Sequence, residues 1–583
     1  MQKRWVIKEA GDERKVKSLA EALNVDHHIA NLLVQKGVST FEEARVFFRP
    51  SLSDLHDPFL MLNMDKAIER IEKAFTNKEK ILVYGDYDVD GTTAVALVYS
   101  FIRRFYKGFC DYYIPDRYKE GYGISIEGID YAHKNNFSLV IALDCGIKAC
   151  EQVKYASSLG IDFIICDHHR PGSEIPEAYA VLDPKQSNCP YPYKELSGCG
   201  LGFKLAQAYY TRHNLAIEEL DEFLDLVAVS IAADIVPIDG ENRTLAYFGL
   251  KKLNLRPRHG LESILLYSGI TRTNPPEEVT VFNRELTISD LVFLIGPRIN
   301  AAGRIDNGRN AVKLLISAND EASVRLGEII NNQNLERRQL DADITRQALE
   351  MIANSDDHQK AKTTVVFNPS WHKGVIGIVA SRLTESYYRP TIVLTESNGL
   401  ITGSARSVKD FDIYDAIDAC SDLLEHFGGH KYAAGLSLKS ENLGLFQEKF
   451  ESIVASTITD QMLVPEIEID SKIELTDISP KFFRILKQFA PYGPGNMAPV
   501  FITGGLVDRG FAKIVGNNHL KMNLTYPGVT NLDFNAIAFQ QGEYYEKVLK
   551  GEPFYIAYHI EENEWNGNTS LQLNIKDMKF EDF

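Results

Sequence analysis

Three aspartates lie at alternate positions in the stretch Tyr84-Gly-Asp86-Tyr-Asp88-Val-Asp90-Gly91, directly after an apolar run. Residues two apart on a β-strand point to the same side, so the three carboxylates project together if the strand continues through them. Ionised carboxylates this close repel one another unless a cation lies among them. A single acid here could simply cap the helix that follows. Three in alternation favour a site that binds cations.

Further acidic positions are associated with apolar runs of the same kind. Asp144 ends one such run, and the triplet Asp167-His168-His169 ends another. Asp234 lies inside a strongly apolar, helix-like run, where an unpaired charge would be costly. A single buried histidine is more often structural than a ligand, but here two histidines and an aspartate stand together at one strand end. We therefore expect a charged partner or a metal ion at these positions.

Carboxylates and imidazoles without thiolates suit Mn²⁺ or Mg²⁺ better than zinc. The seven cysteines form no Cys-x-x-Cys pair, which also disfavours a zinc site and a disulfide framework. One acid can bridge two ions about 3.5–4 Å apart, and such a pair activates water and stabilises the attacking and leaving oxygens of a phosphoryl displacement. These residues therefore predict two-metal hydrolysis of a phosphate ester.

The length and composition indicate a globular protein of several domains. At about 100–200 residues per domain, 583 residues predict three or four domains. No stretch approaches about 18 consecutive apolar residues, and the N-terminus lacks the apolar segment of a secretory signal. Together with the cysteine pattern, this predicts a cytoplasmic location. The net charge of −17 argues against a broadly nucleic-acid-binding surface but leaves room for a local basic groove.

The elements that must position the acids alternate between short apolar runs and helix-length segments. This alternation predicts a mostly parallel α/β sheet, with ligands bound outside the carboxyl ends of its strands. The predicted core strands are Ile81–Tyr84, Asp111–Pro115, Leu139–Leu143, Phe163–Cys166 and Tyr179–Leu182. Along the chain we expect a helical N-terminal segment at 1–75, the α/β core at 76–317, a long connector helix at 318–354 and a second α/β domain at 355–460. The region at 461–583 is expected to be β-rich, as a small barrel or a sandwich.

These motifs resemble those of a known family. Four sites together resemble the signature of the DHH phosphoesterases: Asp88-x-Asp90, Asp144-Cys-Gly, Asp167-His168-His169 and Asp234. Three further segments resemble parts of the DHH-associated domain of that family: 371–382, 403–407 and 426–435. Two further segments, 296–304 and 489–496, look like those of the branch of the family that degrades single-stranded DNA. The similar segments follow the expected order from about residue 50 to the C-terminus.

The resemblance implies a specific set of ligands for two divalent cations, Mn²⁺ or Mg²⁺: Asp88, Asp90, Asp144, His168 and Asp234. Asp144 would bridge the two ions, and His169 would face the scissile phosphate. Related pyrophosphatases carry a histidine where this chain has Tyr84. Because a phenol is a poor ligand for these ions at neutral pH, we expect Asp86 to compensate, either as a ligand or by supporting one.

Several residues of the core are candidates for binding the substrate. Arg298, Asn300 and Arg304 could bind phosphate, since a guanidinium matches phosphate oxygens bidentately, or they could form ordinary salt bridges in a loop. In the segment 115–123, Arg117 is a candidate for phosphate and Tyr122 for stacking on a base. The tyrosine could equally anchor its own loop.

A second group of substrate candidates belongs to the DHH-associated region. Ser404, Arg406 and His430 are predicted in loops of small residues that let the backbone approach a ligand, with simple turns as the alternative. His372 precedes Gly374–Gly377, which is expected to open a helix whose N-terminus could hold a phosphate.

The resemblance implies a single-stranded-DNA-specific 5′→3′ exonuclease that releases 5′-mononucleotides and acts in DNA recombination and repair. The core and the DHH-associated domain would enclose a channel for one strand, and the barrel would be an oligonucleotide-binding module. Single-strand-binding protein and a RecQ-type helicase are the implied partners. Two alternatives stay open. One is a DHH phosphodiesterase for short oligonucleotides or cyclic dinucleotides, which would typically lack the barrel. The other is a non-catalytic DNA-replication scaffold, which would be expected to have lost ligands.

Overall fold

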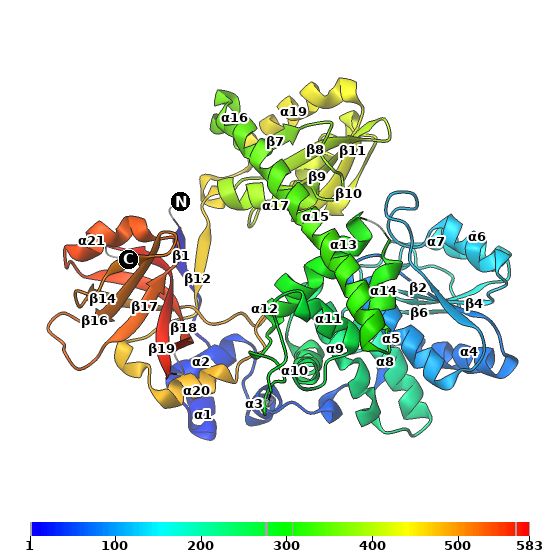
Figure 1. The fold of residues 1–583 in the computed structure, drawn as a ribbon, viewed down its shortest axis with the longest axis horizontal. Helices are drawn as coiled ribbons and strands as arrows, with labels where there is room; N and C mark the ends of the chain where they lie inside the picture. The colour runs from blue at the N-terminus through cyan, green and yellow to red at the C-terminus, as the bar shows by residue number, and fades with distance from the viewer. Residues whose placement is uncertain (1–2, 275–277, 306, 566–567, 582–583) are drawn as a thin grey trace. The chain divides into compact units, whose positions relative to one another are not determined.

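The computed structural model describes residues 3–274, 278–305, 307–565 and 568–581 (Figure 1). The chain groups into two compact units. One unit comprises Arg49–Leu340 and Pro491–Met497, and the other comprises Met1–Phe48, Asp341–Ala490 and Ala498–Phe583. Among the described residues, no helix is both long enough and apolar enough to cross a lipid bilayer.

The first unit is built around a five-stranded parallel sheet in the order β3-β2-β4-β5-β6. This sheet confirms the predicted α/β core. Its strands are apolar almost throughout because a parallel sheet is covered on both faces. The strands are β2 (Ile81–Gly85), β3 (Cys110–Tyr113), β4 (Leu139–Leu143), β5 (Asp162–Cys166) and β6 (Ala180–Leu182).

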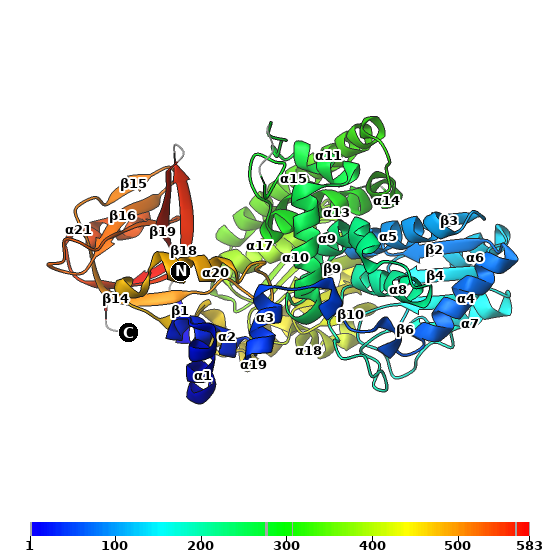
Figure 2. The same ribbon diagram turned by 90° about the horizontal axis from the view of Figure 1, so that it is seen from below.

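Helices cover both faces of this sheet (Figure 2). Because successive side chains of a strand point to opposite faces, Val83 joins one apolar cluster and its neighbour Tyr84 joins the other. The cluster around Val83 includes side chains of α4 (Met64–Asn77), α5 (Val89–Phe105) and α8 (Gly198–Arg212). The cluster around Tyr84 includes side chains of α6 (Ile126–Lys134) and α7 (Cys150–Ser158).

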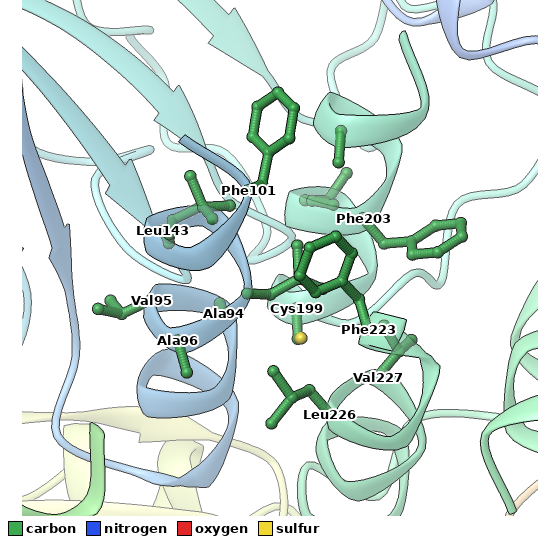
Figure 3. Packing of buried hydrophobic residues seen from close by; sticks show 14 of the residues in the cluster. Ala94, Val95, Ala96, Phe101, Leu143, Cys199, Phe203, Phe223, Leu226 and Val227 are labelled. Carbon is green, nitrogen blue, oxygen red and sulfur yellow. The ribbon is translucent and has the colours of Figure 1, made fainter. Parts of the chain in front are cut away.

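Helix α9 (Leu224–Ala233) packs against α5, α8 and α10 (Gly240–Leu255). Figure 3 shows part of the apolar cluster between these helices, which includes Phe101 of α5, Phe203 of α8 and Leu226 of α9. All nine residues from Leu224 to Ala232 are buried, which explains the absence of a polar face in this run. The rigid seat of α9 fixes the position of whatever follows its last turn.

The unit continues through α11 (His259–Leu266), α12 (Ile288–Asp290), the π-helix η4 (Leu291–Ile295), α13 (Gly296–Ile305) and α14 (Arg309–Leu315). Helix α15 (Asp320–Ala353) confirms the long helix predicted at 318–354. The division between the two compact units falls within it, after Leu340.

The N-terminal segment, predicted as helical over 1–75, begins instead with strand β1 (Arg4–Ile7). This strand pairs in parallel with β12 (Glu466–Ile469), and Trp5 is buried against Ile469 and Ile502. The helical prediction is wrong at these four residues because a strand from a distant part of the chain decides their conformation. The helices α1 (Glu13–Leu23), α2 (His27–Gln35) and α3 (Phe41–Phe48) follow.

The second unit contains a five-stranded sheet in the order β10-β11-β9-β8-β7. Only β7 (Thr364–Phe367) and β8 (Thr391–Ser397) pair in parallel, and the remaining pairs are antiparallel. The glycine-containing segments predicted as loops form strands β9 (Leu400–Arg406) and β10 (His426–His430), which pair with β11 (Ala433–Leu438). That prediction is wrong because ladder pairing outweighs the low strand preference of glycine. Three helices accompany the sheet: α17 (Ile376–Tyr387), α18 (Ile413–Asp418) and α19 (Leu443–Thr457).

The C-terminal region is a closed barrel, which confirms the barrel that the family resemblance implies. Strand β14 pairs with both β18 and β16, so the ring β14-β18-β19-β17-β16 returns on itself. Strands β17 and β19 pair in parallel, and the other pairs in the ring are antiparallel. The ring consists of β14 (Phe501–Asp508), β16 (His519–Thr525), β17 (Phe534–Ala538), β18 (Phe554–Trp565) and β19 (Asn568–Lys579).

Candidate metal centre

The acidic stretch after β2 is a turn into a helix, not an extension of the strand. Strand β2 ends at Gly85 and α5 begins at Val89, so the prediction of three carboxylates along one strand is wrong. Asp88 is the N-cap of α5, and its carboxylate accepts a hydrogen bond from the Gly91 amide at 2.9 Å. A Cβ at Gly91 would lie 2.5 Å from the Asp86 carbonyl oxygen, so the tight turn requires glycine there.

The carboxylate of Asp90 is held by the N-terminus of α8 and by α9. It accepts hydrogen bonds from the amides of Gly198 and Cys199 at 2.7 and 2.8 Å, and from the Ser230 hydroxyl at 2.7 Å. A helix N-terminus favours a negative charge, and hydrogen bonds to an ionised group are strong. The carboxylate of Asp90 is therefore buried with a set orientation.

Asp144 follows β4 in the left-handed region of the backbone, at a φ of 58°. Its amide donates to the Cys166 carbonyl of β5, which ties the two strand ends together. Helix α8 starts so close that a Cβ at Gly198 would lie 2.6 Å from the Asp144 Cβ. The carboxylates of Asp90 and Asp144 thus approach each other through the first turn of α8.

His168 lies at the centre of the acids. Its Nε2 atom is 3.2 Å from Asp144 Oδ1, 3.5 Å from Asp234 Oδ2 and 3.6 Å from Asp90 Oδ2. Ligands about 2.1 Å from an octahedral ion lie about 3 Å from one another, so these separations match a set of atoms around a cation. Asp234 comes from the C-cap of α9, directly after the apolar helix and not inside it.

Several buried atoms of the cluster have no hydrogen-bond partner among the described residues: both carboxylate oxygens of Asp86, Oδ1 of Asp144, and both ring nitrogens of His168. Buried polar atoms are normally paired, so this concentration needs an explanation. Two groups of side chains, Asp144 with His168 and His169, and Asp90 with His168 and Asp234, each bring one ligand atom apiece within 4.8 Å of one another. The donor set of oxygens and imidazole fits Mn²⁺ or Mg²⁺.

The electrostatics point the same way. Burial, followed by the neighbouring carboxylates, raises the pKa of Asp86, Asp88 and Asp144, and raises the pKa of Asp234 to about 8. Burial lowers the pKa of His168. Without a cation this cluster favours protonated acids and a neutral imidazole. A bound divalent cation removes that penalty and explains why so many acids converge.

Asp167 has a different task from the other acids. Its carboxylate accepts from the Ile147 amide at 2.9 Å and from His169 Nδ1 at 2.7 Å. Burial opposes the charge on His169, but the bond and charge of Asp167 raise its pKa to about 9. The His169 side chain is partly exposed, and its raised pKa favours the protonated form in the metal-free protein. The Tyr122 hydroxyl lies 3.3 Å from its Nε2.

Tyr84 takes no part in this cluster. Its hydroxyl donates to the Gly123 carbonyl at 2.9 Å and accepts from the Ser125 amide at 3.1 Å, within the apolar face covered by α6 and α7. Asp86 is fully buried, and burial together with repulsion from Asp88 raises its pKa. That arrangement supports the expectation that Asp86 compensates for the tyrosine.

Two residues at this sheet edge are not among the candidates predicted from the sequence. Asp183 follows β6 and is fully buried, its Oδ2 has no hydrogen-bond partner among the described residues, and burial raises its pKa to about 7. Its signal is in the sequence, because it ends an apolar run as Asp144 does. The ring of Tyr87, between two of the acids, meets Tyr122 edge-on at 6.2 Å and Arg117 at 5.0 Å.

The three candidates on α13 have different environments. Arg298 is buried, and its guanidinium donates to Asn331, to the Leu294 carbonyl and to the Tyr267 carbonyl. These bonds favour a structural role for Arg298 over phosphate binding, although the element is a helix and not the loop that the alternative assumed. Asn300 and Arg304 are half-buried on the same helix.

In the other unit, Ser404 and Arg406 lie on strand β9 beside the start of α17. A Cβ at Gly377 would lie 3.0 Å from Ser404 Oγ and 3.1 Å from Arg406 Nη2, so the side chains reach the helix N-terminus. His372 Nδ1 accepts from the Gly374 amide at 3.1 Å. His430 lies exposed at the end of β10. A hydroxyl, a guanidinium and a helix N-terminus form a suitable cradle for a phosphate.

Comparisons with known proteins agree with this architecture. Residues 80–231 match the N-terminal domain of the DHH family, residues 358–456 match the DHHA1 domain and residues 469–577 match the RecJ OB domain. The single-stranded-DNA-specific exonuclease RecJ of Bacillus subtilis is 38% identical over 98% of this chain and 70% of its own length. The enzyme of the same name from Escherichia coli is 32% identical over 88% of this chain and 89% of its own.

The chain belongs to the RecJ family. A RecJ from Thermus thermophilus in complex with Mn²⁺ has a TM-score of 0.83 and 25% identity, and the match covers all of this chain and 80% of that one. The Mg²⁺ complex of the RecJ from that organism shares the fold at a TM-score of 0.76 and 24% identity. The three domain matches and the RecJ structures confirm the predicted fold class.

Proposed function

We propose that this RecJ-family protein is a metal-dependent exonuclease that degrades single-stranded DNA in the 5′→3′ direction and releases 5′-mononucleotides. The observation that carries the proposal is the convergence of Asp90, Asp144 and Asp234 on His168, with unpartnered buried ligand atoms between them. The relatives named as single-stranded-DNA-specific exonucleases support the substrate. In this proposal the protein acts in DNA recombination and repair and is located in the cytoplasm.

The proposed ligands for two Mn²⁺ or Mg²⁺ ions are Asp86, Asp88, Asp90, Asp144, His168 and Asp234. When bound, such ions supply an activated water and stabilise the oxygens of the phosphodiester. The protein's own residues prepare the site. Asp167 orients His169 by accepting from its Nδ1, and a protonated His169 would donate a hydrogen bond to a phosphate oxygen of the bound strand. Asp144 is the proposed bridge, and Asp88 joins the site while capping α5.

The proposed contacts with DNA are distributed over the chain. Arg117 and Tyr122 bind the strand beside the metal centre, and Asn300 and Arg304 bind it from α13. The cradle of Ser404 and Arg406 receives a phosphate, with His372 and His430 close to the same strand. The proposed parts are the core at 76–317, the connector at 318–354, the domain at 355–460 and the barrel at 461–583, which would hold single-stranded DNA. Single-strand-binding protein and a RecQ-type helicase are the proposed partners.

The proposal is tested by replacing Asp144 with Ala and measuring Mn²⁺-dependent release of nucleotides from labelled single-stranded DNA. Loss of the bridging ligand should abolish turnover while leaving the folded protein intact by circular dichroism. Near-normal turnover would refute the two-metal site. Polarity is tested with oligonucleotides blocked at one end. Digestion that stops with a 3′ block but continues with a 5′ block would contradict the proposed direction.

The same assay separates the alternatives. A phosphodiesterase for short oligonucleotides would act on dinucleotides and leave long strands intact, whereas the proposed enzyme shortens long strands progressively. A non-catalytic scaffold would bind DNA without any metal-dependent release. The closed barrel at the C-terminus and the retained acids favour the exonuclease over both.

A further inference from the structure

A short turn late in the chain belongs to the same compact unit as the metal centre. It is the segment Pro491-Tyr-Gly-Pro-Gly-Asn-Met497, whereas the residues before and after it are grouped with the other unit. Nothing in the proposed chemistry uses this turn, although it overlaps one of the segments that resemble the family. Its contacts therefore need their own explanation.

The turn is seated on the loop that follows Asp234. The Ile238 amide donates to the Pro494 carbonyl at 2.6 Å. A Cβ at Gly493 would lie only 2.4 Å from Ile238 Cδ1, and a Cβ at Gly495 would lie 3.3 Å from Pro237 Cβ. A side chain at Gly493 would therefore force Ile238 to shift, and one at Gly495 would press on Pro237.

The loop itself is held in an unfavourable conformation. Ile235, directly after Asp234, has a φ of 59°, and its side chain is 65% exposed. A β-branched residue rarely adopts this backbone region, and no burial of its own side chain compensates. Contacts with neighbouring groups must therefore hold the loop in this conformation.

Those groups lie on both sides of the loop. From within the core, Asn242 donates to the Pro237 carbonyl at 3.0 Å and Tyr193 donates to the Asp239 carboxylate at 2.7 Å. From the late segment, the turn 491–497 supplies the bond to Ile238 and the glycine contacts. Asp234 stands at the junction between this gripped loop and the rigid helix α9.

We propose that the turn Pro491–Met497 positions Asp234, and that Gly493, Pro494 and Gly495 are positioning residues for the metal centre. By fixing the loop at Ile235–Ile238, the turn sets the direction in which the Asp234 carboxylate meets the atoms of Asp90 and His168. This inference rests on the proposed metal site. Outer contacts of this kind typically change metal affinity or activity by about 10–100-fold when they are lost.

The decisive variant is Gly493→Ala in the full chain. The added methyl group should displace Ile238 and its loop, and weaken Mn²⁺ binding by about tenfold or more. Mn²⁺ affinity is read from the electron paramagnetic resonance signal of free Mn²⁺ during titration of the metal-free protein. The turnover number should fall, while KM for an oligonucleotide changes little, because the displaced group is a ligand and not a DNA contact.

A second substitution serves as a rescue. Ile238→Val removes Cδ1, the atom nearest to the added methyl, so Gly493→Ala with Ile238→Val should recover most of the Mn²⁺ affinity. Failure of the rescue, with Gly493→Ala folded and impaired, would contradict a steric path through Ile238.

If Gly493→Ala does not fold, a matched pair of alanine variants at two other glycines provides the test. Gly495 has a φ of 73° and contacts Pro237, whereas Gly269 has a φ of 79° with open space around its Cβ position. Alanine at either site suffers the same backbone penalty, but only Gly495→Ala should weaken Mn²⁺ binding. Equal losses in both variants, or unchanged affinity in Gly493→Ala and Gly495→Ala, would overturn the inference. Wild-type protein that binds Mn²⁺ but digests no single-stranded DNA would refute the proposed function instead.

Discussion

The Ser230 hydroxyl is the side-chain donor among the three hydrogen bonds that orient Asp90. It donates to Asp90 Oδ1 at 2.7 Å and lies 2.6 Å from the hydroxyl of Ser197, the N-cap of α8. In Ser230→Ala the two backbone donors of Gly198 and Cys199 remain, so the carboxylate stays buried and hydrogen-bonded but loses one fixed direction. A hydrogen bond to a charged group contributes about 1.5–3 kcal/mol.

That free energy corresponds to about 10–100-fold in a binding constant, since about 1.4 kcal/mol is tenfold. We therefore expect Ser230→Ala to weaken Mn²⁺ binding by about this factor and to lower the turnover number at fixed Mn²⁺. Isothermal titration calorimetry on the metal-free protein measures the first, and nucleotide release from labelled single-stranded DNA measures the second. Raising the Mn²⁺ concentration should recover much of the lost rate.

Ser263→Ala is the matched control. Ser263 is also a buried serine in the same unit, and its hydroxyl donates to the Ser323 carbonyl at 2.9 Å, remote from the acids in the hydrogen-bond network. Ser263→Ala should lower the free energy of unfolding by about 0.5–1.5 kcal/mol without changing Mn²⁺ affinity. If Ser230→Ala binds Mn²⁺ and turns over like the wild type, the argument that the outer contacts of Asp90 set the site is wrong.

Two further predictions concern stability. Lys204 is fully buried, and its Nζ lies 3.0 Å from Glu241. Lys204→Met should therefore lower the free energy of unfolding in urea by about 3–5 kcal/mol, and adding Glu241→Gln should recover part of that loss. An unchanged urea midpoint for Lys204→Met would contradict this prediction. In metal-free protein, burial and repulsion raise the pKa of Asp234 to about 8. The protonated Asp234 therefore contributes fully to the free energy of unfolding below pH 3.8, and this contribution is lost as the pH rises through about 8. The difference in unfolding temperature between Mn²⁺-loaded and EDTA-treated protein should therefore widen from about pH 5 to about pH 8, and a constant difference would count against the carboxylate cluster as the metal site.

The sheet and the acids at its edge could be read from the sequence because their signals are local. Asp144 and Asp167 each end an apolar run, and in a parallel sheet such ends lie side by side. The placement of Asp88 and Asp90 could not be read in the same way. Strand continuation and helix onset compete at Gly85, and α5 begins early because Asp88 caps it and Gly91 permits the turn.

Contacts between distant parts of the chain had no local signal at all. Nothing in the residues around Asp90 indicates that Ser230 donates to it, and nothing near Trp5 indicates that β1 pairs with β12. The predicted loops at Ser404 and Arg406 show the same limit, because glycine content alone suggests turns while the pairing of β9 with two neighbours makes a strand. Tertiary pairing decides each of these cases.

The bond between the Ile238 amide and the Pro494 carbonyl also bears on how the protein matures. Synthesis proceeds from the N-terminus, so the sheet, the acids and α9 leave the ribosome long before the turn at 491–497. During that interval the loop after Asp234 lacks its contacts with the turn at 491–497 and would relax from its strained backbone conformation. A nascent or truncated chain ending before Pro491 would thus carry every acid of the site yet hold the last of them loosely. The site would become competent only after the turn at 491–497 has been made.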